Sequence, residues 1–167
     1  MERRATASDH DAVVGIERAA GELFREIGMR EIADDEPIGA ADFAAFVERD
    51  GAWVWEVDDR PVGYLLVEVL DDAAHVEQLS VDPVSGRRGI GTALLDVAAQ
   101  WARERGLSAL SLITFRDVPW NAGFYARRGF RILTAQECGP ELVARLRREA
   151  EHGLDRWPRV PMRRDLA

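Results

Sequence analysis

The chain has 167 residues, which suits one domain with a sizeable buried core, so we expect a single domain over residues 1–167. Hydrophobic residues make up 47% and charged residues 31% of the sequence, as in ordinary globular proteins. No apolar run is long enough to cross a membrane, and the segment from Met1 to Asp11 lacks the apolar core of a secretory signal. The only cysteine, Cys138, excludes an internal disulfide and fits a cytoplasmic location.

The formal net charge of −8 argues against nucleic acid as a partner, because phosphate binding needs a basic surface. An acidic surface is compatible with a cationic substrate, although solubility alone also explains it. No arrangement of His, Asp and Glu in the sequence is typical of a metal site. We therefore expect no nucleic acid, no membrane and no metal.

Patterning in the first half predicts helices followed by an antiparallel meander. Short connections between consecutive strands imply antiparallel neighbours. The expected elements are a strand at Arg3–Thr6, a helix that Ser8 or Asp9 caps before Val13, a loop at Gly28–Gly39, a helix at Ala40–Arg49, and strands at Trp53–Val57, Val62–Leu70 and His75–Val81.

The second half predicts a parallel β-α-β unit. Apolar residues from Ile90 to Trp101 recur every three or four positions, and Gly106 is a typical helix stop. A strand, a crossover helix and another strand make a parallel pair. The expected elements after the helix are a strand buried on both faces at Leu107–Thr114, a helix at Asn121–Arg128, a strand at Phe130–Leu133, a helix at Pro140–His152 and a strand at Val160–Leu166. The fold class is thus α/β (α+β), with a mixed central sheet and helices on both faces.

A glycine-rich loop separates the meander from the first helix of that unit. It reads "GRRGIG", from Gly86 to Gly91, and follows "LSVDP". The first turn of a helix carries backbone N–H groups without intrahelical partners, and the helix dipole adds positive charge there. Glycines let an anion approach these groups, and Arg87 and Arg88 add full charge. The motif is neither a Walker A loop nor a dinucleotide fingerprint. A tight turn without a ligand is the alternative.

These residues resemble the acetyl-CoA loop of the GNAT (GCN5-related N-acetyltransferase) superfamily, which the family writes as Q/R-x-x-G-x-G/A after an apolar-x-Val-x-Pro strand end. Gly86 stands where Gln or Arg is usual, so we expect backbone groups rather than a side chain to bind the cofactor at that position. A second segment, "VPWNAGFYARRGF" from Val118 to Phe130, resembles the later family segment in which Tyr125 precedes Gly129 and Phe130.

The resemblance implies that the chain binds acetyl-CoA as the acyl donor. In the family, the strand end holds the acetyl oxygen and pantetheine, the loop holds the pyrophosphate, and the later segment completes the site. The cofactor-binding residues that it implies are Leu79, Ser80, Val81, Gly86, Arg87, Arg88, Gly89, Ile90, Gly91, Thr92, Asn121 and Tyr125.

Acetyl transfer to an amine needs a base for the ammonium and an acid for the departing thiolate. By resemblance, Tyr125 is the acid and Glu77 is the base, acting directly or through water. Each has a structural alternative: Tyr125 as a core aromatic, and Glu77 as a member of an ion pair or a solvated sheet residue. His75 has a pKa suited to a base but lies at the far end of the same strand.

The sequence therefore predicts an acetyl-CoA-dependent N-acetyltransferase that moves an acetyl group to a primary amine of a small molecule or peptide by direct attack. A CoA-binding regulatory or sensor module without efficient turnover is the alternative. Carboxylates in the early loop, at Glu31, Asp34, Asp35 and Glu36, are candidates to attract a cationic acceptor. A homodimer stays open.

Overall fold

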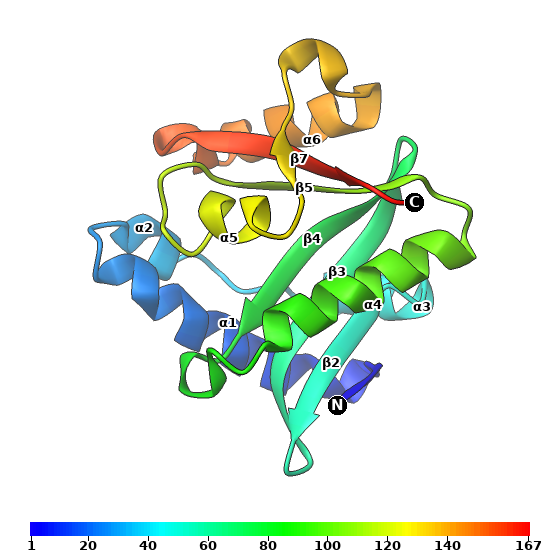
Figure 1. Ribbon diagram of the computed structural model, residues 1–167. Helices are drawn as coiled ribbons and strands as arrows, with labels where there is room; N and C mark the ends of the chain where they lie inside the picture. Colours follow the sequence, from blue (N-terminus) through cyan, green and yellow to red (C-terminus); the bar gives the residue numbers. More distant parts are fainter. The chain divides into compact units, whose positions relative to one another are not determined.

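The computed structural model describes residues 1–167, which form two compact units. Unit 1 comprises Met1–Glu68 and Gln78–Val97, and unit 2 comprises Val69–Glu77 and Ala98–Ala167. Figure 1 traces the elements along the chain. The helices are α1 (His10–Arg25), α2 (Arg30–Ala33), α3 (Ala40–Glu48), α4 (Ile90–Glu104), α5 (Ala122–Ala126) and α6 (Pro140–Glu151). The strands are β1 (Glu2–Arg4), β2 (Ala52–Val57), β3 (Arg60–Leu70), β4 (Ala73–Val81), β5 (Ala109–Phe115), β6 (Arg131–Ile132) and β7 (Arg159–Asp165).

The strands follow the order β1-β2-β3-β4-β5-β7-β6 in a mixed sheet. Strand β2 pairs antiparallel with β1 and with β3. Asp58 and Asp59, which connect β2 to β3, have φ values of 52° and 61°, as a two-residue type I′ hairpin turn requires. The backbone N–H of Asp82 donates to the carbonyl of Val62 at 2.7 Å. The end of β4 thus lies beside the start of β3, and the predicted antiparallel meander is confirmed.

In unit 1, helices cover both faces of the strands. Alternate residues of a strand point to opposite faces. On one face, Tyr64 and Leu66 join the core cluster that also holds residues of α1 and α3. On the other face, a Cβ at Gly63 would lie 3.2 Å from Ile90 Cγ2 and 3.4 Å from Leu94 Cδ1, so α4 packs closely there. This confirms the predicted helices on both faces.

Unit 2 is organised around β5, which is buried along almost its whole length. Residues Ala109–Ser111 of β5 pair in parallel with Ala73–His75 of β4, and this confirms the predicted parallel pair. On its other side, β5 pairs antiparallel with β7 over seven residues, from Ala109↔Asp165 to Phe115↔Arg159. The last strand of the chain therefore lies between β5 and β6.

One prediction about local structure was wrong. The segment Gly28–Gly39 was expected to be a loop, but it contains the single-turn helix α2. The carbonyl of Met29 accepts hydrogen bonds from the N–H groups of Ile32 and Ala33, each at 3.1 Å. Met29 is itself buried, and this anchors the turn. None of the helices is both long and apolar enough to cross a bilayer.

Candidate active site

The loop between β4 and α4 begins with a local cap. The carboxylate of Asp82 accepts a hydrogen bond from the N–H of Val84 at 3.1 Å, and Pro83 opens a short 3-10 turn over Pro83–Ser85. Pro83 suits this position because it fixes φ and has no N–H to satisfy. A Cβ at Gly86 would lie 3.2 Å from the Pro83 carbonyl oxygen, so a side chain there would crowd the turn. Asp82, Pro83 and Gly86 together set the path of the loop.

Gly89 is the N-cap of α4, because its carbonyl accepts the first helical hydrogen bond, from the N–H of Ala93 at 2.9 Å. Gly89 has φ +75°, and a Cβ there would meet no atom within 4 Å. Glycine has no side chain to accept a hydrogen bond. The first-turn N–H groups of Ile90, Gly91 and Thr92 therefore receive no side-chain cap from Gly89. Such a turn is suited to bind an anion.

Two arginines stand beside this helix start. Arg87 and Arg88 are exposed and form no ion pair, whereas many other arginines of the chain are paired with carboxylates. Arg87 has φ +64°, an αL conformation that few residues other than glycine adopt. The loop therefore combines uncommitted positive charge with a left-handed backbone at Arg87 and Gly89.

The end of β4 leads into the loop. The residues predicted there to contact the cofactor, Leu79, Ser80 and Val81, are all partly exposed. The Ser80 carbonyl oxygen would lie 3.3 Å from a Cβ at Gly63. A glycine at position 63 thus lets α4 approach β3 and the Ser80 backbone closely. This packing fixes the start of α4 next to the end of β4.

In unit 2, Tyr125 lies on the short helix α5 and is 8% exposed. Its ring makes edge-to-face contacts with Phe124, at a centroid distance of 5.1 Å, and with Phe130, at 5.6 Å. The N–H of Phe130 donates to the Tyr125 carbonyl at 3.1 Å, and Gly129 between them has φ +89°. Burial raises the pKa of the phenol, and the charge of Arg128 opposes this rise. The phenol therefore stays protonated at neutral pH and is able to donate a hydrogen bond.

Asn121 is the N-cap residue of α5, but its side chain makes no capping hydrogen bond. Its carbonyl accepts the N–H of Tyr125 at 3.1 Å. The Asn121 side chain is partly exposed and remains uncommitted. Its predicted contact with pantetheine stays a prediction.

Glu77, the predicted base, lies on β4 in unit 2. Its carboxylate forms an ion pair with Arg145 of α6, so the ion-pair alternative describes its state in this structure. Glu77 Oε2 also lies 3.5 Å from His75 Nε2, and His75 Nδ1 is 2.9 Å from the Ser111 hydroxyl. Burial and the nearby charge of Arg145 lower the pKa of His75 to about 3. His75 is therefore neutral and buried, and serves as a packing and hydrogen-bonding residue.

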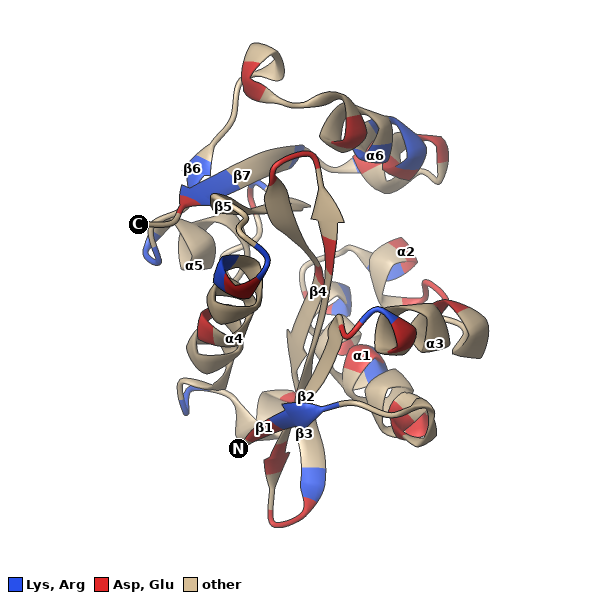
Figure 2. Cartoon of the chain, turned by 90° about the vertical axis from the view of Figure 1, so that its right-hand side faces the viewer, with Lys and Arg blue, Asp and Glu red and all other residues tan.

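Some carboxylates of the early loop already form ion pairs or hydrogen bonds within the chain. Figure 2 shows acidic residues on α2 and after it. Asp34 forms an ion pair with Arg25. Asp35 accepts the N–H of Glu36 at 3.0 Å. Asp35 and Glu36 are exposed, so they stay candidates to attract a cation.

The sequence patterns did not indicate two further residues that contact the predicted site residues or their neighbours. Arg145 is one, because its pairing with Glu77 spans 68 positions and leaves no local signal. Glu17 is the other: it hydrogen bonds to Gln78 and to the backbone of Ile38. A sequence pattern could have indicated Glu17. It follows the buried Val13 by four positions and thus lies on the same, core-facing side of α1.

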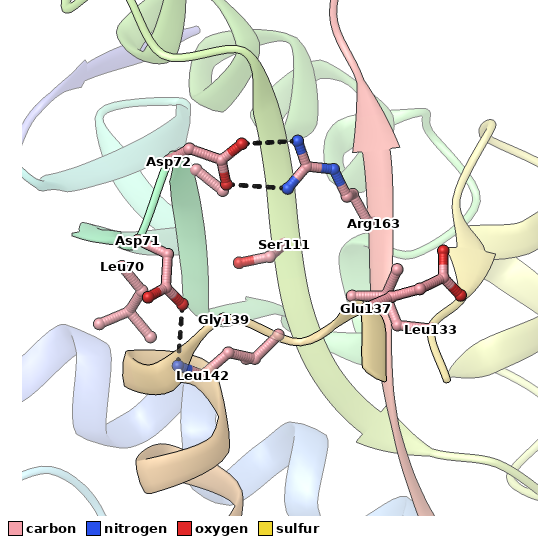
Figure 3. Close-up of a pocket in the computed structure, with 10 residues that line it drawn as sticks. Leu70, Asp71, Asp72, Ser111, Leu133, Glu137, Gly139, Leu142 and Arg163 are labelled. Carbon is pink, nitrogen blue, oxygen red and sulfur yellow. Dashed lines mark hydrogen bonds and ion pairs between the residues drawn. The ribbon is translucent and has the colours of Figure 1, made fainter. Parts of the chain in front are cut away.

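A cavity of about 190 Å³ lies in unit 2, at the turn between β3 and β4 (Figure 3). In it, Asp72 and Arg163 form a two-bond ion pair, with both distances 2.9 Å. The carboxylate of Asp71 accepts the N–H groups of Glu141 and Leu142 and so caps α6. The cavity adjoins Ala73, which begins β4, whereas the predicted cofactor residues end that strand. It is therefore not the predicted cofactor site. No group of three His, Cys, Asp or Glu side chains is arranged to hold a metal ion.

Comparison with known proteins assigns the fold and the loop to a family. The model of the acetyltransferase (GNAT) family matches residues 17–130 of the chain. This match spans β4, the glycine-rich loop, α4 and the Tyr125 segment. The chain therefore belongs to the GNAT family of acetyltransferases.

Two curated relatives match part of the chain. One is the uncharacterized protein YxbD of Bacillus subtilis (strain 168), 34% identical over 103 residues, or 57% of this chain and 64% of YxbD. The other is an uncharacterized N-acetyltransferase of Methanocaldococcus jannaschii, 32% identical over 90 residues, or 50% of this chain and 40% of the relative. The match thus covers less than two thirds of either relative.

Solved structures share the fold over nearly the whole chain. The PaiA N-acetyltransferase of Thermoplasma acidophilum, in complex with coenzyme A, has a TM-score of 0.68 at 15% identity and covers 99% of this chain and 98% of its own. Rv2747 of Mycobacterium tuberculosis, in complex with CoA and NLQ, has a TM-score of 0.70 at 24% identity, covering 100% and 99%. The ribosomal-protein-S18-alanine N-acetyltransferase of Escherichia coli has a TM-score of 0.67 at 17% identity, covering 100% and 94%. At these identities the likeness concerns the fold.

Proposed function

We propose that the chain is an acetyl-CoA-dependent N-acetyltransferase, one domain over residues 1–167, that acetylates a primary amine of a small molecule or peptide by direct attack. The observation that carries this proposal is the loop before α4. Gly89 occupies the N-cap position of α4 but has no side chain to accept from the first-turn N–H groups, and Arg87 and Arg88 are exposed and unpaired. This is the chemistry that binds a pyrophosphate through backbone N–H groups and nearby positive charge.

The residues proposed to hold acetyl-CoA have separate tasks. Residues Gly86–Thr92 bind the pyrophosphate, and the backbone of Leu79–Val81 binds the acetyl oxygen and pantetheine, with Asn121 as a further contact. Tyr125 donates a proton or hydrogen bond to the departing thiolate, which its protonated state supports. Acetyl-CoA is the cosubstrate, and its thioester supplies the activated acetyl group.

Glu77 is proposed to accept the proton of the amine, directly or through water. An alkylammonium with a pKa near 10 must lose its proton before it attacks. Its ion pair with Arg145 means that the base role and the structural role of Glu77 have to be separated by experiment. Glu77→Gln removes both roles, whereas Arg145→Gln removes the ion pair alone.

The test is an acceptor screen with acetyl-CoA that records free thiol release and, in parallel, the mass of the acetylated amine. The chain contains no lysine, so acetylation of its own lysine side chains does not contribute thiol. Calorimetry with CoA measures cofactor binding separately. Binding of CoA with no turnover over a broad amine panel supports the regulatory module instead, and absence of CoA binding overturns both proposals.

A further inference from the structure

Unit 1 contains a polar cluster that none of the roles above uses. Glu17 of α1 accepts one hydrogen bond at each carboxylate oxygen. Oε1 accepts from Gln78 Nε2 of β4 at 3.0 Å, and Oε2 accepts from the backbone N–H of Ile38, also at 3.0 Å. No arginine pairs with Glu17, so its negative charge is balanced only by these neutral donors.

The Tyr64 hydroxyl lies at the bottom of this cluster. Tyr64 is 0% exposed, and its hydroxyl makes no hydrogen bond of normal geometry. Burial and then the charge of Glu17 raise the pKa of the phenol well above its ordinary value, while hydrogen-bonding interactions with the nearby Ser80 and Gln78 side chains lower it. These three side chains are thus the polar groups around the hydroxyl. A buried hydroxyl without a well-formed hydrogen bond is unfavourable for folding, and a ligand group that supplies such a bond removes this cost.

The cluster has further contacts on a second side, through Ile38. The Ile38 carbonyl lies 2.7 Å from His10 Nε2, and the His10 ring packs on Phe43 with a centroid distance of 5.8 Å. The N–H and C=O of Ile38 are therefore both fixed, one by Glu17 and one by His10. Glu17 is positioned in advance, as a binding carboxylate needs to be.

The chemistry of the cluster matches a primary ammonium. An alkylammonium group has three N–H donors and no acceptor. A carboxylate offers about four lone-pair positions, and in Glu17 the donors of Gln78 and Ile38 occupy two of them. The amide oxygen of Gln78 and the hydroxyl oxygen of Tyr64 are further acceptors. Glu17 and Gln78 are partly exposed, so a ligand is able to reach them.

We infer that Glu17 and Gln78 bind a protonated amino group of the acceptor other than the amine that reacts, with the Tyr64 hydroxyl beside them as a positioning group. The inference rests on the proposed function, because Gln78 directly precedes the β4 residues assigned to the acetyl group and pantetheine. It narrows the acceptor to an alkylamine that carries a second, cationic amino group, and it assigns recognition of that second group to Glu17. The exposed carboxylates of the α2 loop then have at most a role in attracting the cation.

A binding experiment decides this without turnover. Pentane-1,5-diamine is titrated into the protein, and the NMR signals of the Gln78 side-chain amide and the Ile38 backbone amide are followed. Pentane-1,5-diol, of equal length but without charge, is the matched ligand control. We expect shifts with the diamine in the wild type, and loss of these shifts with the diol and in Glu17→Gln. Signals that do not respond to the diamine, or respond equally in Glu17→Gln, overturn the inference.

Kinetics add a second readout. Glu17→Gln is expected to lower kcat/KM for amines by about 10- to 100-fold, mainly through KM, because a charge-assisted hydrogen bond is lost. Asp11→Asn makes the same charge change at an exposed position of α1 and is expected to leave KM within twofold. Equal KM values for Glu17→Gln and Asp11→Asn contradict the inference. If no amine is acetylated by the wild type, the proposed function fails, while the titration still decides the role of Glu17.

Tyr64→Phe separates positioning from packing. Removing a buried hydroxyl that makes no hydrogen bond of normal geometry is expected to leave the midpoint of unfolding unchanged or raised. We expect the same variant to raise KM for the amine severalfold, because the group beneath Glu17 and Gln78 is lost. A variant with an unchanged KM shows that the hydroxyl has no part in amine recognition. This variant also serves if Glu17→Gln does not fold.

Discussion

Two segments carry the proposed chemistry, and they are built in opposite ways. In the loop from Asp82 to Thr92, the groups proposed to bind are backbone N–H groups of exposed residues, set by the φ values of Arg87 and Gly89. In the segment from Trp120 to Phe130, the proposed group is one buried phenol, set by the packing of Phe124 and Phe130. The loop should thus tolerate side-chain changes that keep its backbone angles. The Tyr125 segment should tolerate backbone adjustment better than loss of a single oxygen.

The largest effect is expected from Tyr125→Phe. This change keeps both ring contacts but removes the donor, so turnover should fall by about 10²- to 10⁴-fold. The CoA dissociation constant should stay within about threefold, because the loop is untouched. Steady-state kinetics and calorimetry measure the two quantities. Unchanged turnover would remove Tyr125 from the mechanism and leave it as a core aromatic.

Variants of Glu77 and Arg145 test whether a side chain of β4 acts as the catalytic base. Glu77→Gln removes both the base and the ion pair, whereas Arg145→Gln removes the ion pair alone. We expect turnover to fall by about 10²-fold in Glu77→Gln, with an altered pH profile. Arg145→Gln should lower the unfolding midpoint but keep turnover within about tenfold. Equal losses in the two variants would mean that Glu77 acts by holding α6.

A smaller effect concerns stability and pH. His75 has a pKa of about 3 in the fold, but about 6.5 when unfolded. Between these values the unfolded chain binds a proton that the folded chain does not, so stability falls as the pH falls. From pH 6.5 to 5 the loss is about 2 kcal/mol. Urea unfolding of wild type and His75→Asn at both pH values measures it, and parallel pH dependence in the two proteins would refute the assignment.

The next effect in size is expected from changes to the backbone of the loop. Gly89 and Gly106 lie near opposite ends of α4, have φ of +75° and +69°, and have no atom within 4 Å of an added Cβ. Each Gly→Ala change should therefore cost a similar amount, about 1 kcal/mol of stability. Only Gly89→Ala should also weaken CoA binding, by about fivefold. Equal CoA affinities in the two variants would show that the αL backbone at Gly89 does not serve the cofactor.

The smallest effects should come from the loop arginines. Arg87→Ala or Arg88→Ala is expected to weaken CoA binding about two- to fivefold, and less at high salt, because exposed charges are screened. Arg103→Ala, an exposed and unpaired arginine near the other end of α4, is the control. An effect above about 100-fold would mean that a side chain, and not the backbone, dominates the loop.

Sequence patterns predicted most of the fold because its main elements, such as α1, α4 and β3, are long and regular. The apolar runs of β2 and β3 on either side of a turn, and the apolar spacing in α4, specified their type, and the φ of Gly89 agrees with a glycine there. The single turn of α2 is too short for any period to show. Strand β7 lies between β5 and β6 through pairing across distant parts of the sequence, which local pattern does not encode. The partner of Glu77 is hidden for the same reason.

The cap of α6 has a consequence for how unit 2 opens. Asp71 caps this helix from 70 positions away, and in return the Glu141 carboxylate accepts the Asp71 N–H at 2.9 Å. A Cβ at Gly139 would clash with the Asp71 carboxylate, so a glycine at this position leaves the space that the reciprocal contact needs. The β3–β4 turn and the first turn of α6 should therefore exchange their amide hydrogens as one cooperative unit. A cleavage in the chain after α6 would leave that helix bound to the hairpin.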